Sequence, residues 1–135
     1  MGAVLLNDRV AAALAPGDHA TTFGGGPFVA SVALEVLRTV GDPAFLADVR
    51  SKGAWLGERL TKLTATRPRI RAVRGRGLMW GIELAEPAAP FVAAAREQRL
   101  LILTAGPNVI RIVPPLTISR AELERGVAVL AEVLA

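Results

Sequence analysis

Cysteine is absent from this sequence of 135 residues, and aromatic residues make up only 4% of it. Without cysteine the chain can form neither a disulfide framework nor a thiolate metal site. Because aromatic side chains are so few, a hydrophobic core must be built from alanine, valine, leucine and isoleucine. No apolar segment approaches the roughly 18 uncharged residues that a membrane-spanning helix needs, so we expect no membrane segment.

The residues that are present are sufficient for one compact domain, or for the last third of a larger enzyme. Hydrophobic residues account for 52% of the chain, so a core can form and disorder is not expected. The first 18 residues carry Asp8 and Arg9 inside their apolar run and lack the basic start and cleavage site of a signal peptide. These features predict a cytoplasmic protein.

Periodicity and turn residues predict alternating helices and strands after a short N-terminal segment. Residues 1–26 are expected to hold a short apolar strand, a mixed segment and a polar, glycine-rich turn. Helices are predicted over 28–41, 43–67 and 90–99 and from Ser119 onward, and strands over 70–73, 78–84, 101–103 and 109–113. The natural boundary lies near Gly26, where the turn gives way to a long helix.

Two of these helices have specific start signals. Asp42 precedes Pro43, and an aspartate can cap free amides while proline suits the first helical position. Ser119 is followed three residues later by Glu122, which is the pattern of a capping box. Helices separated by short strands imply a two-layer α+β domain.

The glycine-rich turn, GDHATTFGGGP at residues 17–27, places two hydroxyls before a helix. A helix N-terminus offers unpaired amides and partial positive charge, and glycines let the backbone approach an oxyanion closely. Thr21 and Thr22 are therefore candidates for an anion site. The simpler interpretation, an N-cap threonine followed by a flexible loop, is favoured by the residues alone.

Arg111 is the second candidate, because it lies within a predicted strand between Ile110 and Ile112. An arginine in that position is either solvated on an edge strand or held inward to bind a carboxylate, whose geometry matches the planar guanidinium. The residues alone favour the solvated alternative. His19 is the only histidine, so no metal site is expected, and Trp55 and Trp80 are interpreted as packing residues.

Three segments together resemble the class III pyridoxal-phosphate aminotransferases. They are the turn GDHATTFGGGP, the run VRGRGLMWGIEL at 73–84 and the run LLILTAGPNVIRIVPPLTIS at 100–119. The last resembles the acetylornithine branch most closely, although acetylornithine and succinylornithine enzymes share these motifs. The resemblance covers nearly the whole chain in family order.

The resemblance implies the C-terminal small domain of a fold-type I pyridoxal-phosphate-dependent transferase, with helices packed on a small, mainly antiparallel sheet. Residues 1–26 would be a remnant of the large cofactor-binding domain, and residues 27–135 the linking helix and small domain. The family also implies a homodimer and pyridoxal 5'-phosphate. By resemblance, Thr22 would bind the phosphate of the partner subunit's cofactor, Thr21 would contact the substrate there, and Arg111 would hold the substrate α-carboxylate.

The sequence departs from the family in two ways. Gly26 stands where the family usually has asparagine. The Schiff-base lysine of the family lies shortly before the segment that Met1–Val4 resembles, so no catalytic residue is assigned here. The only lysines, Lys52 and Lys62, fall in a predicted helix far from any matching motif. We therefore expect the chain alone to be inactive as a transaminase.

Two other classes of function are compatible with parts of the sequence. A non-enzymatic ligand-binding or dimerisation module would have the same small-domain fold. A nucleic-acid binder would use the five arginines between Arg67 and Arg76, which account for most of the net charge of +4. Arg69 and Arg71 alternate with apolar residues and no aromatic residues are interleaved for base stacking, so we expect no nucleic-acid partner.

Overall fold

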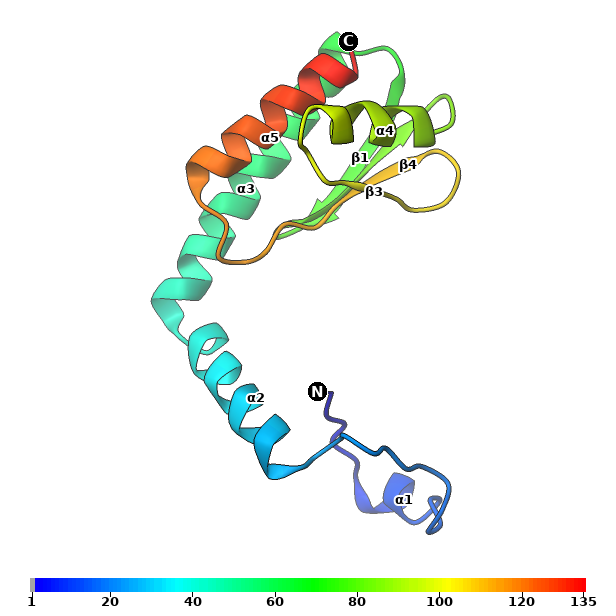
Figure 1. Ribbon diagram of the computed structural model, residues 1–135, viewed down its shortest axis with the longest axis vertical. Helices are drawn as coiled ribbons and strands as arrows, with labels where there is room; N and C mark the ends of the chain where they lie inside the picture. The colour runs from blue at the N-terminus through cyan, green and yellow to red at the C-terminus, as the bar shows by residue number, and fades with distance from the viewer. Residues whose placement is uncertain (1) are drawn as a thin grey trace. The chain divides into compact units, whose positions relative to one another are not determined.

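The computed structural model describes residues 2–135, and the chain divides into two compact units, Met1–Phe45 and Leu46–Ala135. Figure 1 shows both units. The point of division lies inside a helix rather than at Gly26. The predicted boundary near Gly26 separates a remnant of the cofactor-binding domain from the small domain. This identification of the two parts was inferred from the family resemblance and stays a prediction.

The first unit contains two helices, α1 (Asp8–Ala11) and α2 (Pro27–Val40), and no residue of either helix is buried. The amide of Val10 donates to the Asn7 side chain at the start of α1. The strand expected near the start is not formed, because a strand needs a hydrogen-bonded neighbour and none pairs with residues 2–26. The prediction of that strand was wrong.

The helix boundaries around Gly41 agree with the prediction. Helix α2 ends with Gly41 as its C-cap, and α3 spans Pro43–Thr66. The Asp42 carboxylate accepts a hydrogen bond of 2.8 Å from the amide of Phe45, so it caps the first turn of α3 as expected.

A four-stranded antiparallel sheet lies in the second unit. Its strands are β1 (Ile70–Arg76), β2 (Met79–Leu84), β3 (Leu103–Thr104) and β4 (Val109–Ile112). The order across the sheet is β1-β2-β4-β3, so β4 is an inner strand. The β1–β2 hairpin turns at Gly77, whose φ of +58° suits a residue without a side chain.

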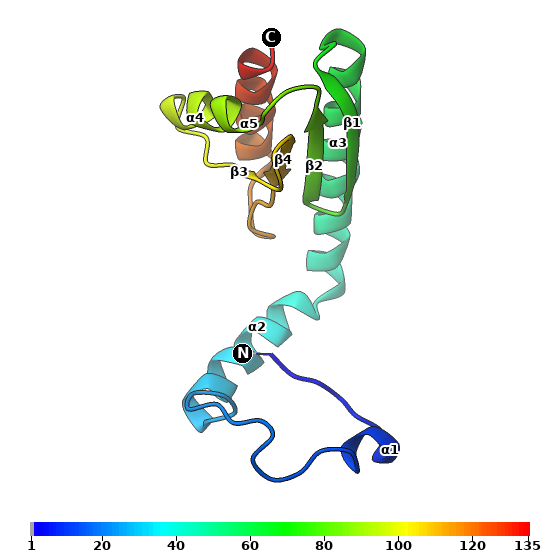
Figure 2. The same ribbon diagram turned by 90° about the vertical axis from the view of Figure 1, so that its right-hand side faces the viewer.

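Helices α3 and α5 (Arg120–Val133) cover one face of this sheet, and α4 (Ala89–Glu97) packs against α5 and β3. The opposite face, turned toward the viewer in Figure 2, has no helix of the second unit over it. Aliphatic side chains from the helices and from β1, β2 and β4 form one core, and the largest that are fully buried are Leu56, Leu60, Ile82, Leu84, Ile110 and Leu134. The predicted α+β fold with a mainly antiparallel sheet is confirmed.

Within residues 2–135, every helix is too short or too polar to span a membrane.

Candidate functional site

The turn before α2 presents both threonines to solvent. Thr21 and Thr22 are exposed, and neither hydroxyl forms a hydrogen bond with any group in residues 2–135. The N-cap of α2 is Gly26, which makes no side-chain capping bond. The simpler interpretation of the turn, an N-cap threonine, is therefore wrong, and the first amides of α2 keep no side-chain partner.

Glycine at position 24 leaves room for the Thr21 side chain to lie against the turn. A Cβ atom built on Gly24 would lie 2.2 Å from the Thr21 methyl carbon, so any side chain there would displace Thr21. Gly25 follows with a φ of +79°, in the left-handed region that favours glycine. These two residues explain why the loop reverses tightly between the hydroxyls and the helix.

The donor chemistry of this turn fits a phosphate. Two unpaired hydroxyls precede the uncapped N-terminus of a helix of 14 residues, where amide donors and the helix dipole favour negative charge. Cβ positions at Gly25 and Gly26 have no other atom within 4 Å, so the backbone there is open to a ligand. The nearest acidic side chain in sequence, Asp18, already accepts a bond of 2.7 Å from the Ala15 amide.

Arg111 lies on β4, on the uncovered face of the sheet. Its backbone pairs with Gly81 of β2 on one side and with Leu103 of β3 on the other. Its side chain is exposed, and it forms no hydrogen bond or ion pair with any group in residues 2–135. The favoured alternative, a solvated arginine, agrees with this exposure, but its edge strand is wrong because β4 is an inner strand, and the buried alternative is also wrong. Ile110 and Ile112 point into the core, so alternation along an inner strand directs Arg111 outward.

Glu83, to which the sequence assigned no role, pairs with Arg74 on the same uncovered face. The Arg74 Nη1 and Glu83 Oε2 atoms are 2.6 Å apart. The two residues are diagonal neighbours across the β1–β2 ladder, because Glu83 pairs directly with Ala72, two residues before Arg74. The motif VRGRGLMWGIEL could have indicated this pair, because a hairpin centred on its glycines brings its two charged ends together.

Most of the basic run at 67–76 is engaged within the fold. Arg67 donates two hydrogen bonds to the carbonyl of Ala131. Arg69 pairs with Glu86 at 3.2 Å and stacks over the ring of Phe91. These arginines point to different elements, so they do not form one continuous basic patch.

Both lysines lie on α3 and pair with carboxylates one turn earlier. Lys52 is 2.5 Å from Asp48, and its side chain is only 12% exposed. Lys62 is 2.5 Å from Glu58, and this hydrogen bond, together with the lysine charge, lowers the pKa of Glu58 below its ordinary value. His19 is exposed, and residues 2–135 contain no cluster of side chains suited to a metal.

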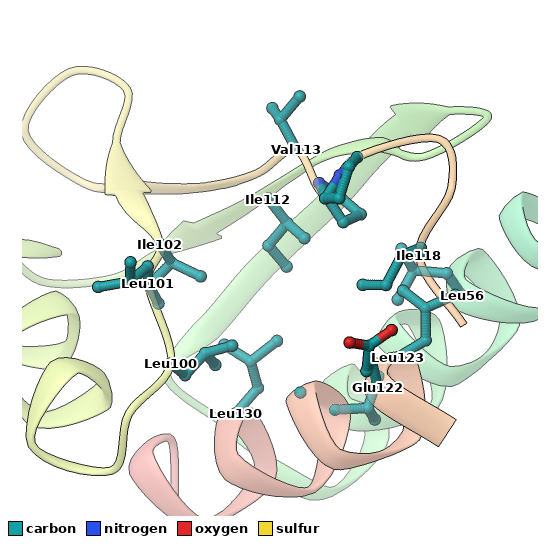
Figure 3. Close-up of a pocket in the computed structure, with 14 residues that line it drawn as sticks. Leu56, Leu100, Leu101, Ile102, Ile112, Val113, Ile118, Glu122, Leu123 and Leu130 are labelled. Atoms are coloured by element: carbon teal, nitrogen blue, oxygen red, sulfur yellow. The ribbon is translucent and has the colours of Figure 1, made fainter. Parts of the chain in front are cut away.

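An apolar pocket of about 230 Å³ opens beside α5 (Figure 3). Leucine, isoleucine, valine and proline side chains line it, and Glu122 is its only charged lining residue. The Glu122 carboxylate accepts from the Ser119 hydroxyl and amide, and these bonds lower the pKa of Glu122. The pocket therefore offers no free polar group for a phosphate or an amino acid.

The class-III aminotransferase family model matches residues 1–134. The chain belongs to this family. Its fold is thus that of the C-terminal part of a pyridoxal-phosphate-dependent aminotransferase. Thr21 and Thr22 lie in the first unit and Arg111 in the second, and their roles stay predictions.

Relatives of the family are similar over the whole chain. The chain is 48% identical to the mitochondrial acetylornithine aminotransferase of Alnus glutinosa over 99% of its own length. It is 40% identical to the acetylornithine aminotransferase of Listeria innocua, again over 99% of its length. It spans 30% and 35%, respectively, of these two proteins.

Solved structures show the same relationship. N-acetylornithine aminotransferase from Stenotrophomonas maltophilia is 34% identical with a TM-score of 0.75, covering 82% of this chain and 31% of that one. Ornithine δ-aminotransferase of Plasmodium falciparum is 26% identical with a TM-score of 0.85, covering 96% and 35%. The ornithine aminotransferase of Toxoplasma gondii is 28% identical with a TM-score of 0.81, covering 93% of this chain and 30% of that one. Pyridoxal phosphate partly occupies the active site of that protein.

Proposed function

We propose that this chain is the C-terminal part of an acetylornithine transaminase. The complete enzyme would transfer an amino group between N-acetylornithine and 2-oxoglutarate, a step of arginine biosynthesis. The similarity to acetylornithine aminotransferases at 40–48% identity supports this choice of substrate. The structural observation that carries the proposal is Arg111, whose guanidinium has no partner among residues 2–135 and lies on the uncovered face of the sheet.

Arg111 would bind the α-carboxylate of N-acetylornithine and, in the other half-reaction, that of glutamate. Its planar guanidinium can form two parallel charge-assisted hydrogen bonds with one carboxylate. Because β4 is hydrogen-bonded on both sides, the backbone that carries Arg111 is held in place before the substrate arrives. This residue would therefore orient both substrates in the same way.

Thr22 and the first amides of α2 would hold the phosphate of pyridoxal phosphate. When bound, the cofactor supplies an electron sink that stabilises negative charge at the substrate carbon. The Thr22 hydroxyl would donate to a phosphate oxygen, and the α2 N-terminus would add partial positive charge. Thr21 would contact the substrate. We propose that both threonines serve the active site of the partner subunit in a homodimer.

The lysines of this chain do not fit the role of a covalent cofactor anchor. Lys52 and Lys62 are both on α3 and are both paired with carboxylates. We therefore propose that the 135-residue chain lacks transaminase activity by itself. A cytoplasmic location stays a prediction.

A chimaeric enzyme tests the proposed function. This chain would replace the matching C-terminal segment of the Listeria innocua acetylornithine aminotransferase, to which it aligns over 134 residues. We expect the chimaera to bind pyridoxal phosphate and to transaminate N-acetylornithine with 2-oxoglutarate. Arg111→Ala should raise the KM for glutamate about 100-fold, because two charge-assisted bonds are lost. Thr22→Val should weaken cofactor binding about tenfold, and Thr22→Ser should restore it.

Arg71→Ala is the matched control, since Arg71 is exposed on β1 and forms no ion pair within residues 2–135. It should leave both constants unchanged. A folded chimaera that binds the cofactor but does not act on N-acetylornithine would contradict the proposed substrate. An active chimaera that is indifferent to Arg111→Ala would contradict the role of the arginine.

A further inference from the structure

One row of residues crosses the uncovered face of the sheet, with one residue from each strand. Backbone pairing sets its order as Arg74, Gly81, Arg111 and Leu103. Residues that are directly paired across an antiparallel ladder point to the same face. Because Ile82 and Ile110 point into the core, this row belongs to the opposite, uncovered face.

Gly81 separates the two arginines of this row. Adjacent strands are about 5 Å apart, so the backbones of Arg74 and Arg111 lie about 10 Å apart, with the bare backbone of Gly81 between them. A hollow of about 460 Å³ opens on this part of the sheet. Arg74, Gly81 and Arg111 line it, together with the apolar side chains of Met79 and Val109 and, at the end of the hairpin, Arg76.

The two arginines differ in what they can still bind. Arg74 is already neutralised by Glu83, at 2.6 Å. Arg111 has no partner among residues 2–135, so all of its donors are available. A carboxylate that enters the hollow would therefore be attracted to Arg111, while Arg74, paired with Glu83, lines the hollow on the far side of Gly81.

The fold itself does not require glycine at position 81. Gly81 does not have a positive φ. A Cβ atom there would lie 3.3 Å from a Val109 methyl group and 3.8 Å from the Arg74 carbonyl oxygen. A small movement of that methyl group would accommodate alanine. Glycine weakens the interior of a strand. A glycine on an inner strand therefore often marks a place where a ligand approaches the backbone closely.

We propose that Gly81 is a specificity-determining residue that leaves space for a substrate carboxylate to reach Arg111. The proposal rests on the proposed function of Arg111 as the carboxylate-binding residue. A β-branched side chain at position 81 would project into the hollow beside Arg111 and exclude the carboxylate. Alanine would fill only part of that space.

Chemical modification of the 135-residue chain tests this proposal. Phenylglyoxal modifies accessible arginines, and mass spectrometry of peptides gives the rate for each one. In the wild-type chain we expect Arg111 to react and L-glutamate to protect it. In Gly81→Val the reaction of Arg111 should slow, and the glutamate concentration for half-protection should rise about tenfold, as expected when one charge-assisted bond is lost.

Two controls accompany these variants. Arg71, exposed and without an ion pair in residues 2–135, should react at the same rate in every variant. Ala72→Val adds methyl groups to β1 outside the hollow and should leave Arg111 unchanged. Gly81→Ala, which the backbone accommodates, should give a smaller effect in the same direction and serves if the valine variant does not fold.

The outcomes separate the two proposals. If glutamate fails to protect Arg111 in the wild-type chain, the role of Arg111 as a carboxylate-binding residue is wrong. If glutamate protects Arg111 equally well in the wild-type chain and in folded Gly81 variants, only the inference about Gly81 is overturned.

Discussion

The indole ring of Trp80 lies against the backbone of Gly57. A Cβ atom built on Gly57 would be 2.4 Å from two carbons of that ring, and one built on Gly75 would be 2.4 Å from a third. The indole N–H donates a hydrogen bond of 2.8 Å to the carbonyl of Gly77. The ring is therefore held between α3 and the β1–β2 hairpin, and it fixes the sheet against the helix.

Gly57→Ala should destabilise the chain by about 1–3 kcal/mol, because the added methyl group must displace a large ring from a packed position. The gain in helix propensity, about 1 kcal/mol, offsets only part of this cost. Urea denaturation followed by circular dichroism measures the change. The matched control is Gly126→Ala on α5, whose Cβ would make an ordinary contact of 3.6 Å with Leu100. That variant should be as stable as the wild type or more so; equal stability of both variants would rule out the packing of Trp80 described here.

The sequence predicted the elements whose ends carry local chemical signals. Asp42 before Pro43, Gly41 after an apolar stripe, and Ser119 with Glu122 all specify helix ends through nearest-neighbour hydrogen bonds. The structure places α2, α3 and α5 at these positions. The β1–β2 hairpin was also predicted, although β1 extends three residues further, to Arg76. The extra residues of β1 pair with β2 although they are not apolar, and the predicted end of the strand was based on apolar residues alone.

The features that depend on tertiary pairing could not be predicted. The strand expected near the start had apolar residues but no neighbour in residues 2–26 with which to pair. Arg111 lies on an inner strand because β4 pairs both with β3, its neighbour in sequence, and with β2, which α4 and β3 separate from it along the chain. Strand order in the sheet is not determined by local periodicity. These long-range relationships define the candidate substrate face.

Ser119→Ala should destabilise the chain by about 1 kcal/mol, the usual cost of removing a serine N-cap. The Ser119 hydroxyl accepts from the amide of Glu122, and the Glu122 carboxylate accepts from the amide of Ser119. Thermal unfolding measures the effect. Ser119→Asp, which retains an N-cap acceptor, should recover most of the stability. If the aspartate variant is as unstable as the alanine variant, the loss does not come from capping.

The same capping box makes the difference between wild type and Ser119→Ala depend on pH. Hydrogen bonds from Ser119 lower the pKa of Glu122 in the folded chain. A lowered pKa stabilises the folded state above the unfolded value of about 4.3, and this contribution is lost as the pH falls through the folded value. The difference in unfolding temperature should therefore be largest at neutral pH and should shrink below about pH 4. The difference should not fall to zero, because the hydrogen bond from the Glu122 amide to the Ser119 hydroxyl does not depend on pH. A difference in unfolding temperature that stays the same at every pH would contradict the role of the carboxylate.

Arg67→Ala should destabilise the chain by about 1–2 kcal/mol, because Arg67 ties the end of α3 to the end of α5. Its Nε and Nη2 atoms donate to the Ala131 carbonyl at 3.2 Å and 3.0 Å, and that contact joins residues 64 positions apart. A cation beside the last carbonyls of a helix also interacts favourably with the helix dipole.

Arg67→Lys should retain the charge but not both bonds, and its stability should be intermediate. Arg71→Ala, which removes an exposed arginine from the same basic run, should change the free energy of unfolding by less than about 0.5 kcal/mol. If urea denaturation shows the same small change for Arg67→Ala as for Arg71→Ala, the basic run has no structural role at Arg67, and a ligand-binding role for its charges would have to be considered again.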